Sequence, residues 1–370
     1  MKIRALLFSA LCLLALGAGF TSCDDNDDPD YDDTGSQVTL SRNRVFILNE
    51  GGWNQNNANI SFYDPDHTVD FIKDIFQKQN NAKLGELGQD MIKYDDHIYV
   101  IVSGSQYITK LNAAGVEQCR FAFPAGEGQP RYLTAEDGYI YVTQYGGRVS
   151  KLDAGSLQRV KTFDGGSNLE GIAEENGLLY VANGYTVTES GYDYLDELLV
   201  IDANTMEQKS TIKVRRNPNK MMEANDRIFV LSSLVYQTPD GNLIQMIEPK
   251  ANNTVTPITT ATHMAAKGDI LYLINSETVN SATGSTIVNT FFTYNMSTKQ
   301  LSNTSFLKDV PDKLKSTTVY CLEINEENGD FYIGTTNYTS TGTIYRFKKD
   351  GTFVTNFDCG GINPNHLVFF

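Results

Sequence analysis

The sequence predicts an all-β fold, a seven-bladed β-propeller of four-stranded blades that is closed by the C-terminal strand. The first observation is a short apolar run around a central Tyr or Phe, which recurs along the chain at a period of roughly 40 to 60 residues. The second is that further strand-like runs follow each copy. The seven copies are VFIL from Val45, IYVIV from Ile98, IYVTQ from Ile140, LYVAN from Leu179, IFVLS from Ile228, LYLIN from Leu271 and FYIGT from Phe331.

The clearest repeating unit spans residues 128–164 and indicates why each copy is interpreted as four strands. Turn signals at 136–138, 145–147 and 153–156 separate four runs that are rich in β-branched and aromatic residues. The apolar run is the second strand of each unit. The third strands are ISFYD, ITKLN, VSKLD, LLVID, IQMIE, FFTYN and IYRFK, and fourth strands such as FIKDIF, CRFAF, RVKTFD, STIKV and FVTNF follow them.

The first strand of the unit indicates how the ring closes. Six repeats have one (GQDMI, QPRYL, NLEGI, PNKMM, THMAA and VYCLEI), but nothing comparable precedes Val45. The C-terminal segment Asn363 to Phe370, NPNHLVFF, matches NPNKMM and stands alone. We therefore expect it to supply the innermost strand of blade one, which would remove two exposed sheet edges.

Length and composition favour a single exported domain. The repeats fill residues 44–370 and leave no room for a second core. The formal net charge of −15 makes nucleic acid and anionic lipid poor partners. Cys119, Cys321 and Cys359 lie in different strands without metal-site spacing, so we expect buried thiols, or one disulfide and a leftover thiol.

The first 43 residues are interpreted as targeting segments. Residues 1–22 combine a basic start with an apolar stretch too short to span a membrane, which is typical of a signal peptide. Residues 20–23, Phe-Thr-Ser-Cys, resemble a bacterial lipobox, so we expect Cys23 to be lipidated; an ordinary cleaved secretory signal is the alternative. Residues 23–43 are expected to form an acidic, disordered tether, because seven Asp crowd into ten residues from Asp24.

Polar side chains recur at matching positions of the innermost strands, which line the channel of a propeller. The expected channel residues are Asp90, Arg131, Glu170, Lys220 and His366. The less regular blades offer His263 or Met264, and Tyr320 or Cys321. One interpretation is a structural ring in which Asp90 pairs with Arg131 and Glu170 pairs with Lys220. The other is a polar floor beneath a ligand, and the two are compatible.

The loops after the second strands are expected to be long and polar, and to surround the channel mouth. They are rich in Asn, Gln, Ser, Thr and Tyr, which suits a recognition surface for an uncharged polar ligand. Trp53, the only Trp, is interpreted as a ligand platform or a loop anchor. The further candidate ligand contacts in these loops are Asn54, Asn56, Tyr107, Tyr145, Arg148, Tyr185, Tyr236 and Tyr338.

The sequence does not favour catalysis. It contains four His, no G-x-S-x-G or H-E-x-x-H motif and no phosphate-binding glycine loop. We therefore expect no enzyme activity, no metal and no required cofactor. A propeller hydrolase or lyase that uses Glu170, His263 or His366 remains the alternative from another functional class.

The repeated strands resemble the YncE-like seven-bladed propellers over residues 44–370. The opening RVFILNEGGWNQNNANISFYDPD from Arg44 resembles a subgroup of surface lipoproteins, the BtuG type, which capture vitamin B12 and related corrinoids and pass them to a TonB-dependent outer-membrane transporter. The acidic run after Cys23 also resembles the export signal of surface-displayed lipoproteins.

The resemblance implies a cell-surface, lipid-anchored outer-membrane protein that binds cobalamin and delivers it to a TonB-dependent receptor. A periplasmic lipoprotein is the alternative location. The alternative ligand is a glycan, which the same aromatic and amide side chains would also suit.

Overall fold

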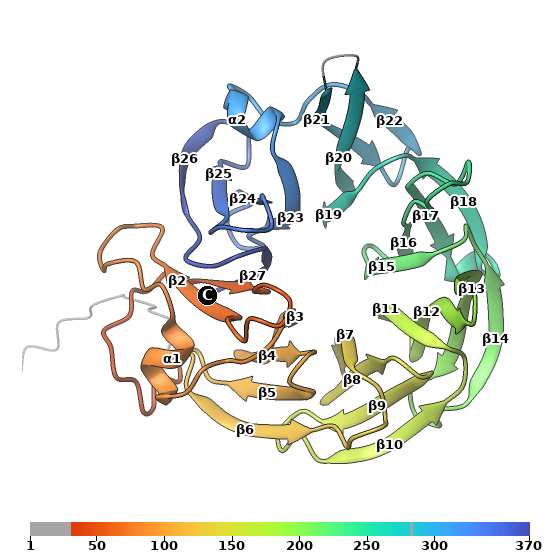
Figure 1. Cartoon of the computed structure of the whole chain (residues 1–370), viewed down its shortest axis with the longest axis horizontal. Coiled ribbons are helices and arrows are strands. Elements are labelled where there is room, and N and C mark those ends of the chain that lie inside the picture. Colours follow the sequence, from red (N-terminus) through yellow and green to blue (C-terminus); the bar gives the residue numbers. More distant parts are fainter. Residues whose placement is uncertain (1–30, 282–283) are drawn as a thin grey trace, which may run out of the picture. The chain divides into compact units, whose positions relative to one another are not determined.

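Residues 31–281 and 284–370 are described by the computed structural model, and they form a ring of seven antiparallel sheets (Figure 1). Within each complete blade the strands follow one another in chain order from the centre of the ring outward. The predicted seven-bladed propeller is therefore confirmed. The signal peptide, Cys23 and the first part of the acidic run lie outside the described residues.

The strands of the first four blades are as follows. Blade 1 contains β27 (Pro364–Phe369), β1 (Val45–Asn49) and β2 (Asn59–Tyr63), and blade 2 contains β3 (Gly88–Tyr94), β4 (His97–Val102), β5 (Tyr107–Leu111) and β6 (Glu117–Ala122). Blade 3 contains β7 (Pro130–Glu136), β8 (Tyr139–Gln144), β9 (Arg148–Asp153) and β10 (Arg159–Asp164), and blade 4 contains β11 (Asn168–Glu175), β12 (Leu178–Thr188), β13 (Gly191–Asp202) and β14 (Gln208–Lys213).

The remaining three blades repeat the pattern. Blade 5 contains β15 (Pro218–Glu223), β16 (Ile228–Ser232), β17 (Leu243–Glu248) and β18 (Thr254–Thr259). Blade 6 contains β19 (His263–Lys267), β20 (Ile270–Ser281), β21 (Gly284–Asn295) and β22 (Gln300–Ser302). Blade 7 contains β23 (Thr318–Ile324), β24 (Phe331–Thr336), β25 (Thr343–Phe347) and β26 (Phe353–Asp358). The short helices are α1 (Ile75–Asn80), α2 (Asp312–Lys315) and the 3-10 turn η1 (Pro249–Ala251).

Blade 1 is closed by the C-terminal strand, as the sequence predicts. Strand β27 pairs with β1 in antiparallel register, with Leu48 opposite His366. The pairing extends to Arg44, whose N–H donates to the Phe370 carbonyl at 2.8 Å. The innermost position of the first blade is thus supplied by the last residues of the chain.

The fourth strand of blade 1 is shorter than expected. The FIKDIF segment pairs with β2 only at Ile72, which exchanges two backbone hydrogen bonds with Phe62 at 2.9 and 3.0 Å. Two residues later the Asp74 carboxylate accepts the Gln77 N–H at 2.9 Å and caps α1. An N-cap of this kind favours a helix over a continued strand, so Ile75 and Phe76 are helical.

The Tyr at the centre of the second strand connects neighbouring blades. Tyr99, Tyr141 and Tyr180 are buried, and each hydroxyl reaches the turn between the third and fourth strands of the next blade. Tyr99 donates to the Ala154 carbonyl at 2.8 Å, Tyr141 to the Ala203 carbonyl at 3.3 Å and Tyr180 to Asn253 Oδ1 at 3.2 Å. In these three blades the Tyr supplies apolar area to the interface with the next blade and satisfies its own polar end, whereas the buried Tyr332 hydroxyl of blade 7 has no hydrogen-bond partner among the described residues.

The ring has two faces. The upper face carries the loops after the second strands, and the lower face carries the turns between the first and second strands and those between the third and fourth strands. Because the strands of a blade are antiparallel, each innermost strand runs from the upper face to the lower face. The termini of the described propeller, Tyr31 and Phe370, pack against each other with ring centroids 5.5 Å apart.

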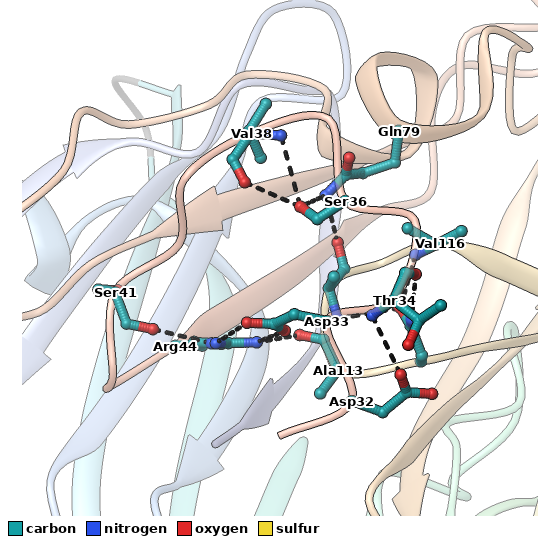
Figure 2. Close-up of polar contacts among 12 residues, drawn as sticks. Asp32, Asp33, Thr34, Ser36, Val38, Ser41, Arg44, Gln79, Ala113 and Val116 are labelled. Atoms are coloured by element: carbon teal, nitrogen blue, oxygen red, sulfur yellow. Dashed lines mark hydrogen bonds and ion pairs between the residues drawn. The ribbon is translucent and has the colours of Figure 1, made fainter. Parts of the chain in front are cut away.

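Residues 31–43, which we call the strap, lie against the lower turns of blades 1 and 2 (Figure 2). The Arg44 guanidinium donates to the Asp33 carboxylate at 2.5 Å and to the Ala113 carbonyl at 2.8 Å. Gln79 Oε1 accepts the Gln37 N–H at 2.7 Å. The expectation of a disordered tether over residues 23–43 is therefore wrong for the strap, because its carboxylates and amides have partners in the fold.

The described residues contain three free cysteines and no disulfide. Cys321 and Cys359 are buried, and Cys119 is half-buried. Within the described part of the chain, no helix has the length and apolar character that crossing a membrane requires.

Candidate functional site

The upper face carries two β-hairpins where the sequence suggested long loops. Strands β12 and β13 remain paired out to Thr188 and Gly191, and β20 and β21 out to Ser281 and Gly284. These ribbons continue beyond the other strands of their sheets. Their sequences alternate β-branched or aromatic residues with polar ones, a pattern that favours strands even where the residues are not buried.

Large apolar side chains are exposed on the upper face. Trp53 is 68% exposed, Tyr192 65%, Tyr236 81% and Tyr338 56%, and they come from blades 1, 4, 5 and 7. Val187, Leu234, Val279 and Val288 are also exposed on loops or hairpins of this face. Single exposed apolar side chains are normal on protein surfaces, so it is their gathering on one face that makes the upper face a candidate interaction site.

An ion pair between two innermost strands lies beneath the upper face. Arg131 on β7 donates to Glu170 on β11 at 3.0 Å and to Gln89 Oε1 at 2.5 Å. The Tyr145 hydroxyl donates to the other oxygen of Glu170 at 3.0 Å. Burial raises the pKa of Glu170, and the Arg131 guanidinium acts against this.

A row of tyrosines continues from this ion pair onto the β12–β13 hairpin. The Arg131 guanidinium lies 4.7 Å from the centroid of the Tyr145 ring. Tyr145 meets Tyr185 edge to face at 5.8 Å, and Tyr185 meets Tyr192 at 5.2 Å. The row therefore joins the buried pair to an exposed aromatic side chain.

A second acidic group lies at the opposite side of the channel mouth. Glu50, the residue after β1, accepts a hydrogen bond from the Tyr320 hydroxyl of blade 7. Burial raises the pKa of Glu50, while Tyr320, Arg131 and Lys220 act to lower it. Tyr320 contacts the exposed Tyr338 with ring centroids 6.0 Å apart.

His366 lies between two carboxylates. Its Nε2 is 3.1 Å from Asp90 Oδ1 and its Nδ1 is 3.1 Å from Glu323 Oε1. Asp90 also accepts the N–H groups of Met91 at 3.0 Å and Leu133 at 2.9 Å. Burial alone would lower the pKa of His366, but Asp90 and Glu323 raise it above its usual value.

The predicted pairing of Asp90 with Arg131 and of Glu170 with Lys220 is therefore wrong. Each group has two neighbouring blades, and Asp90 makes its ion pair with the preceding blade, where His366 lies. Arg131 is then left to pair with Glu170 in the following blade. The Lys220 ammonium group forms no ion pair or hydrogen bond with any residue in the described ranges, and its charge acts on Glu50 and Asp90 from a longer distance.

A cavity of about 840 Å³ runs along the innermost strands below these groups. Asp90, Lys220, His263 and His366 line it, so the structure brings four of the expected channel residues together. Its lining also includes the lower turn residues Asp95, Asp96, Glu326 and Glu327. The cavity therefore reaches the lower face, whereas we expected the site on the upper face alone. Burial first, and then the charge of Lys220, lowers the pKa of His263 to about 3.

Two expected ligand contacts lie elsewhere. Tyr107 is buried as the first residue of β5, and its hydroxyl donates to the Leu84 carbonyl, because the loop before it is tighter than expected. Arg148 is held by Glu127 at 2.8 Å and by Asp164 at 2.6 Å, away from the cavity. Tyr107 is therefore too buried to offer a surface to a ligand, whereas a ligand contact of Arg148 on the upper face stays a prediction.

Asn54 and Asn56 shape the loop that carries Trp53. Both residues have left-handed backbone conformations, with φ values of 59° and 48°. Their N–H groups donate to the two oxygens of Glu86 at 2.5 Å each. Asn tolerates this conformation better than most residues, so the sequence suits the turn. Their side chains are exposed on the upper face together with Tyr236.

Several residues at these positions were not predicted from the sequence. Glu50, Gln89, Tyr132 and Glu323 contact or flank the channel groups, and Tyr192 extends the tyrosine row. The sequence did contain a signal for Tyr192. Tyr192 and Tyr194 are two residues apart, a spacing that places both side chains on the same face of a strand. Within residues 31–281 and 284–370, no group of three or more His, Cys, Asp or Glu side chains could hold a metal ion.

The comparisons with known proteins support the fold. The family model described as "Domain of unknown function (DUF5074)" matches residues 43–363. The chain is similar to the hydrazine synthase of Kuenenia stuttgartiensis, with 14% identity over 71% of this chain and 77% of that chain and a TM-score of 0.56. It is also similar to the Pan2 WD40 domain of Neurospora crassa, with 11% identity, 72% and 78% coverage and a TM-score of 0.51. Identities this low carry the fold alone. No curated protein matches the chain.

Proposed function

The chain belongs to the DUF5074 family, and we propose that it is a non-catalytic binding protein whose upper face captures a cobalamin-type corrinoid. The observation that carries this proposal is the set of exposed aromatic side chains on that face. Trp53, Tyr192, Tyr236 and Tyr338 come from four blades and are all more than half exposed. Aromatic side chains held apart on a rigid ring suit a wide ligand that several loops contact at once.

The chemistry of the loops supports a large neutral ligand. A corrinoid is a broad ring with a fringe of amide groups, which neutral Asn, Gln, Ser, Thr and Tyr side chains can recognise. The charged groups beneath the face, Arg131 with Glu170 and Asp90 with His366, neutralise each other. This arrangement favours a frame for binding over a pair of free catalytic carboxylates.

The proposal includes a location and a partner. We propose that Cys23 is lipidated, that the protein is displayed at the outer-membrane surface, and that it passes the ligand to a TonB-dependent receptor. The strap supports this orientation, because it enters the propeller at the lower turns near Ala113. An anchor on that side would leave the upper face directed toward the ligand and the receptor.

Titration calorimetry on residues 31–370 tests the ligand class. We expect heat from cyanocobalamin and from cobinamide, and none from neutral oligosaccharides such as maltohexaose. Heat from the sugars alone would replace the corrinoid with a glycan and leave the upper face as the site. No heat from any of these ligands would contradict the proposal.

Single substitutions test the surface. Trp53→Ala and Tyr236→Ala should each cost about 1–3 kcal/mol of binding free energy to cyanocobalamin, if these side chains lie in the desolvated centre of the interface. The matched control is Phe71→Ala, because Phe71 is also an exposed aromatic residue at 40% but lies beside the outer edge of blade 1. Equal affinities of all three variants and the unchanged protein would place the ligand elsewhere.

A further inference from the structure

The channel cavity differs from the upper face in the side chains that line it, which include methionines and charged groups. Its volume of about 840 Å³ lies within the range of roughly 300–1,000 Å³ that is typical of small-molecule sites. It lies below the ion pairs at the channel mouth and reaches the lower face between the turns that carry Asp95 and Glu326. A molecule in it would not occupy the surface on which Trp53 and Tyr236 lie.

The wall of the cavity is apolar and adaptable. Met221 and Met222 on β15 and Met264 on β19 line it, and Ile92 and Ala266 continue the same surface. These side chains are half-buried, so part of each faces the cavity and not a neighbouring blade. Methionine side chains adjust to ligands of different shape because they are unbranched and flexible.

The inner end of the cavity offers an ammonium group that makes no hydrogen bond within the described residues. Asp90 and Glu323 each lie 3.1 Å from a nitrogen of His366, and Asp90 also accepts two backbone N–H groups. The Lys220 ammonium group lines the same end and forms no hydrogen bond or ion pair with a described residue, although its charge acts on Glu50 and Asp90. This group would gain an acceptor from a bound molecule.

The acidic residues at the rim of the lower opening of the cavity limit the charge that the acceptor group of a bound molecule can carry. Asp95, Asp96, Glu326 and Glu327 are exposed around the opening, and Lys93 offsets only Asp96, at 3.6 Å. An anion would be repelled by this rim and by Asp90 with Glu323, because the single charge of His366 offsets only one of these two carboxylates. A cation would be attracted by the rim but would meet Lys220 at the inner end.

We infer that this cavity is a second ligand site, for an elongated apolar molecule that ends in a neutral hydrogen-bond acceptor such as a carboxamide, with the acceptor on Lys220 and the chain along Met221, Met222 and Met264. The site is independent of the corrinoid proposed for the upper face.

Three ligands with the same tail test the inference: decanamide, decanoate and decylamine. Calorimetry on residues 31–370 at neutral pH should show binding of decanamide, at least five-fold weaker binding of decanoate, and no binding of decylamine. Lys220→Met should weaken decanamide at least ten-fold, because the variant keeps the length of the side chain and loses its donor. Lys161→Met, on the exposed outer strand β10, is the matched control and should bind decanamide like the unchanged protein.

A second variant covers the case in which Lys220→Met does not fold. Ala266→Phe should narrow the cavity beside Met264 and weaken decanamide binding at least ten-fold, while the heat from cyanocobalamin stays the same. Equal affinity for the three ligands, no binding of decanamide, or unchanged binding in Ala266→Phe would overturn the inference. Because cyanocobalamin is measured in the same variants, loss of the cavity site is distinguished from loss of the upper-face site.

Discussion

At the scale of single residues, the ion pairs of the channel cannot be predicted from the spacing of the charged residues along the chain. Asp90 could reach Arg131 in the following blade or His366 in the preceding one, and it pairs with His366 at 3.1 Å. The other carboxylate oxygen of Asp90, Oδ2, accepts the Leu133 N–H of the following blade at 2.9 Å. A buried carboxylate is stable only when its remaining lone pairs also have donors, and this arrangement supplies them.

The raised pKa of His366 predicts a pH-dependent contribution to stability. A histidine whose pKa is higher in the folded protein than in the unfolded chain stabilises the fold in its protonated form. This contribution is present below the unfolded value of about 6.5 and is lost as the pH rises through the folded value. We expect His366→Gln to lower the free energy of unfolding by about 1–3 kcal/mol near pH 6 and by less at pH 9.

Urea denaturation between pH 6 and pH 9 measures this difference. The matched control is Asn365→Ala on the same strand, which removes a hydrogen bond of 2.6 Å to the Gln89 carbonyl but no titratable group. Its destabilisation should not change over this range. A His366→Gln difference that grows as the pH rises would contradict the proposed role of the two carboxylates.

At the scale of elements, the strap connects the start of the propeller to its closing strand. Tyr31 packs on Phe370, and the Arg44 guanidinium lies 4.6 Å from the centroid of the Tyr31 ring. The same guanidinium holds Asp33 and the Ala113 carbonyl. The Arg44 side chain is only 5% exposed, so its contact with the Ala113 carbonyl is shielded from water, whereas Asp33 is 43% exposed and its ion pair is partly screened by salt.

Loss of the strap contacts should destabilise the propeller without unfolding it. We expect Arg44→Met to lower the free energy of unfolding by roughly 1–3 kcal/mol, because the Asp33 carboxylate and a buried carbonyl each lose a donor. Thermal unfolding would show the change as a lower melting temperature. Lys83→Met, an exposed cation in the chain before β3, is the control and should melt like the unchanged protein. A melting temperature that is the same for both variants would mean that the strap is not part of the stable fold.

At the scale of the whole molecule, the ring depends on its last strand. Strand β27 pairs with β1 and supplies His366 to the channel and Phe370 to the core of blade 1. Without it, β1 would present an unpaired edge and the interface between blades 7 and 1 would lose Leu367. Unpaired edges of this kind promote aggregation.

Deletion of residues 363–370 should therefore abolish soluble, folded protein. Eight residues at the end of an ordinary domain usually matter little, so the effect is specific to ring closure. Deletion of residues 31–38, also eight residues, is the matched control and should leave a folded protein with a lower melting temperature. Size-exclusion chromatography and circular dichroism of the two proteins measure the outcome. A monomeric, folded product of the C-terminal deletion would show that closure by β27 is dispensable.

The sequence by itself determined the propeller, the number of blades and the closing strand. These features depend on local patterns: the alternation of each strand, the turn signals between strands and the period of the repeat. The central Tyr or Phe of the second strands was visible in the same way, because the blades share a large apolar side chain at this position. The residues that line the channel were also readable, since Asp90, Lys220, His263 and His366 occupy matching positions and do line one cavity.

Only the tertiary structure decided how these residues are used. Pairing of Asp90 with His366 joins residues 276 positions apart and depends on which blade lies on each side. The burial of Tyr107, the docking of the strap and the opening of the cavity toward the lower face depend on the distances between blades. Local sequence patterns carry no information on such distances, because they result from how whole sheets pack around the ring.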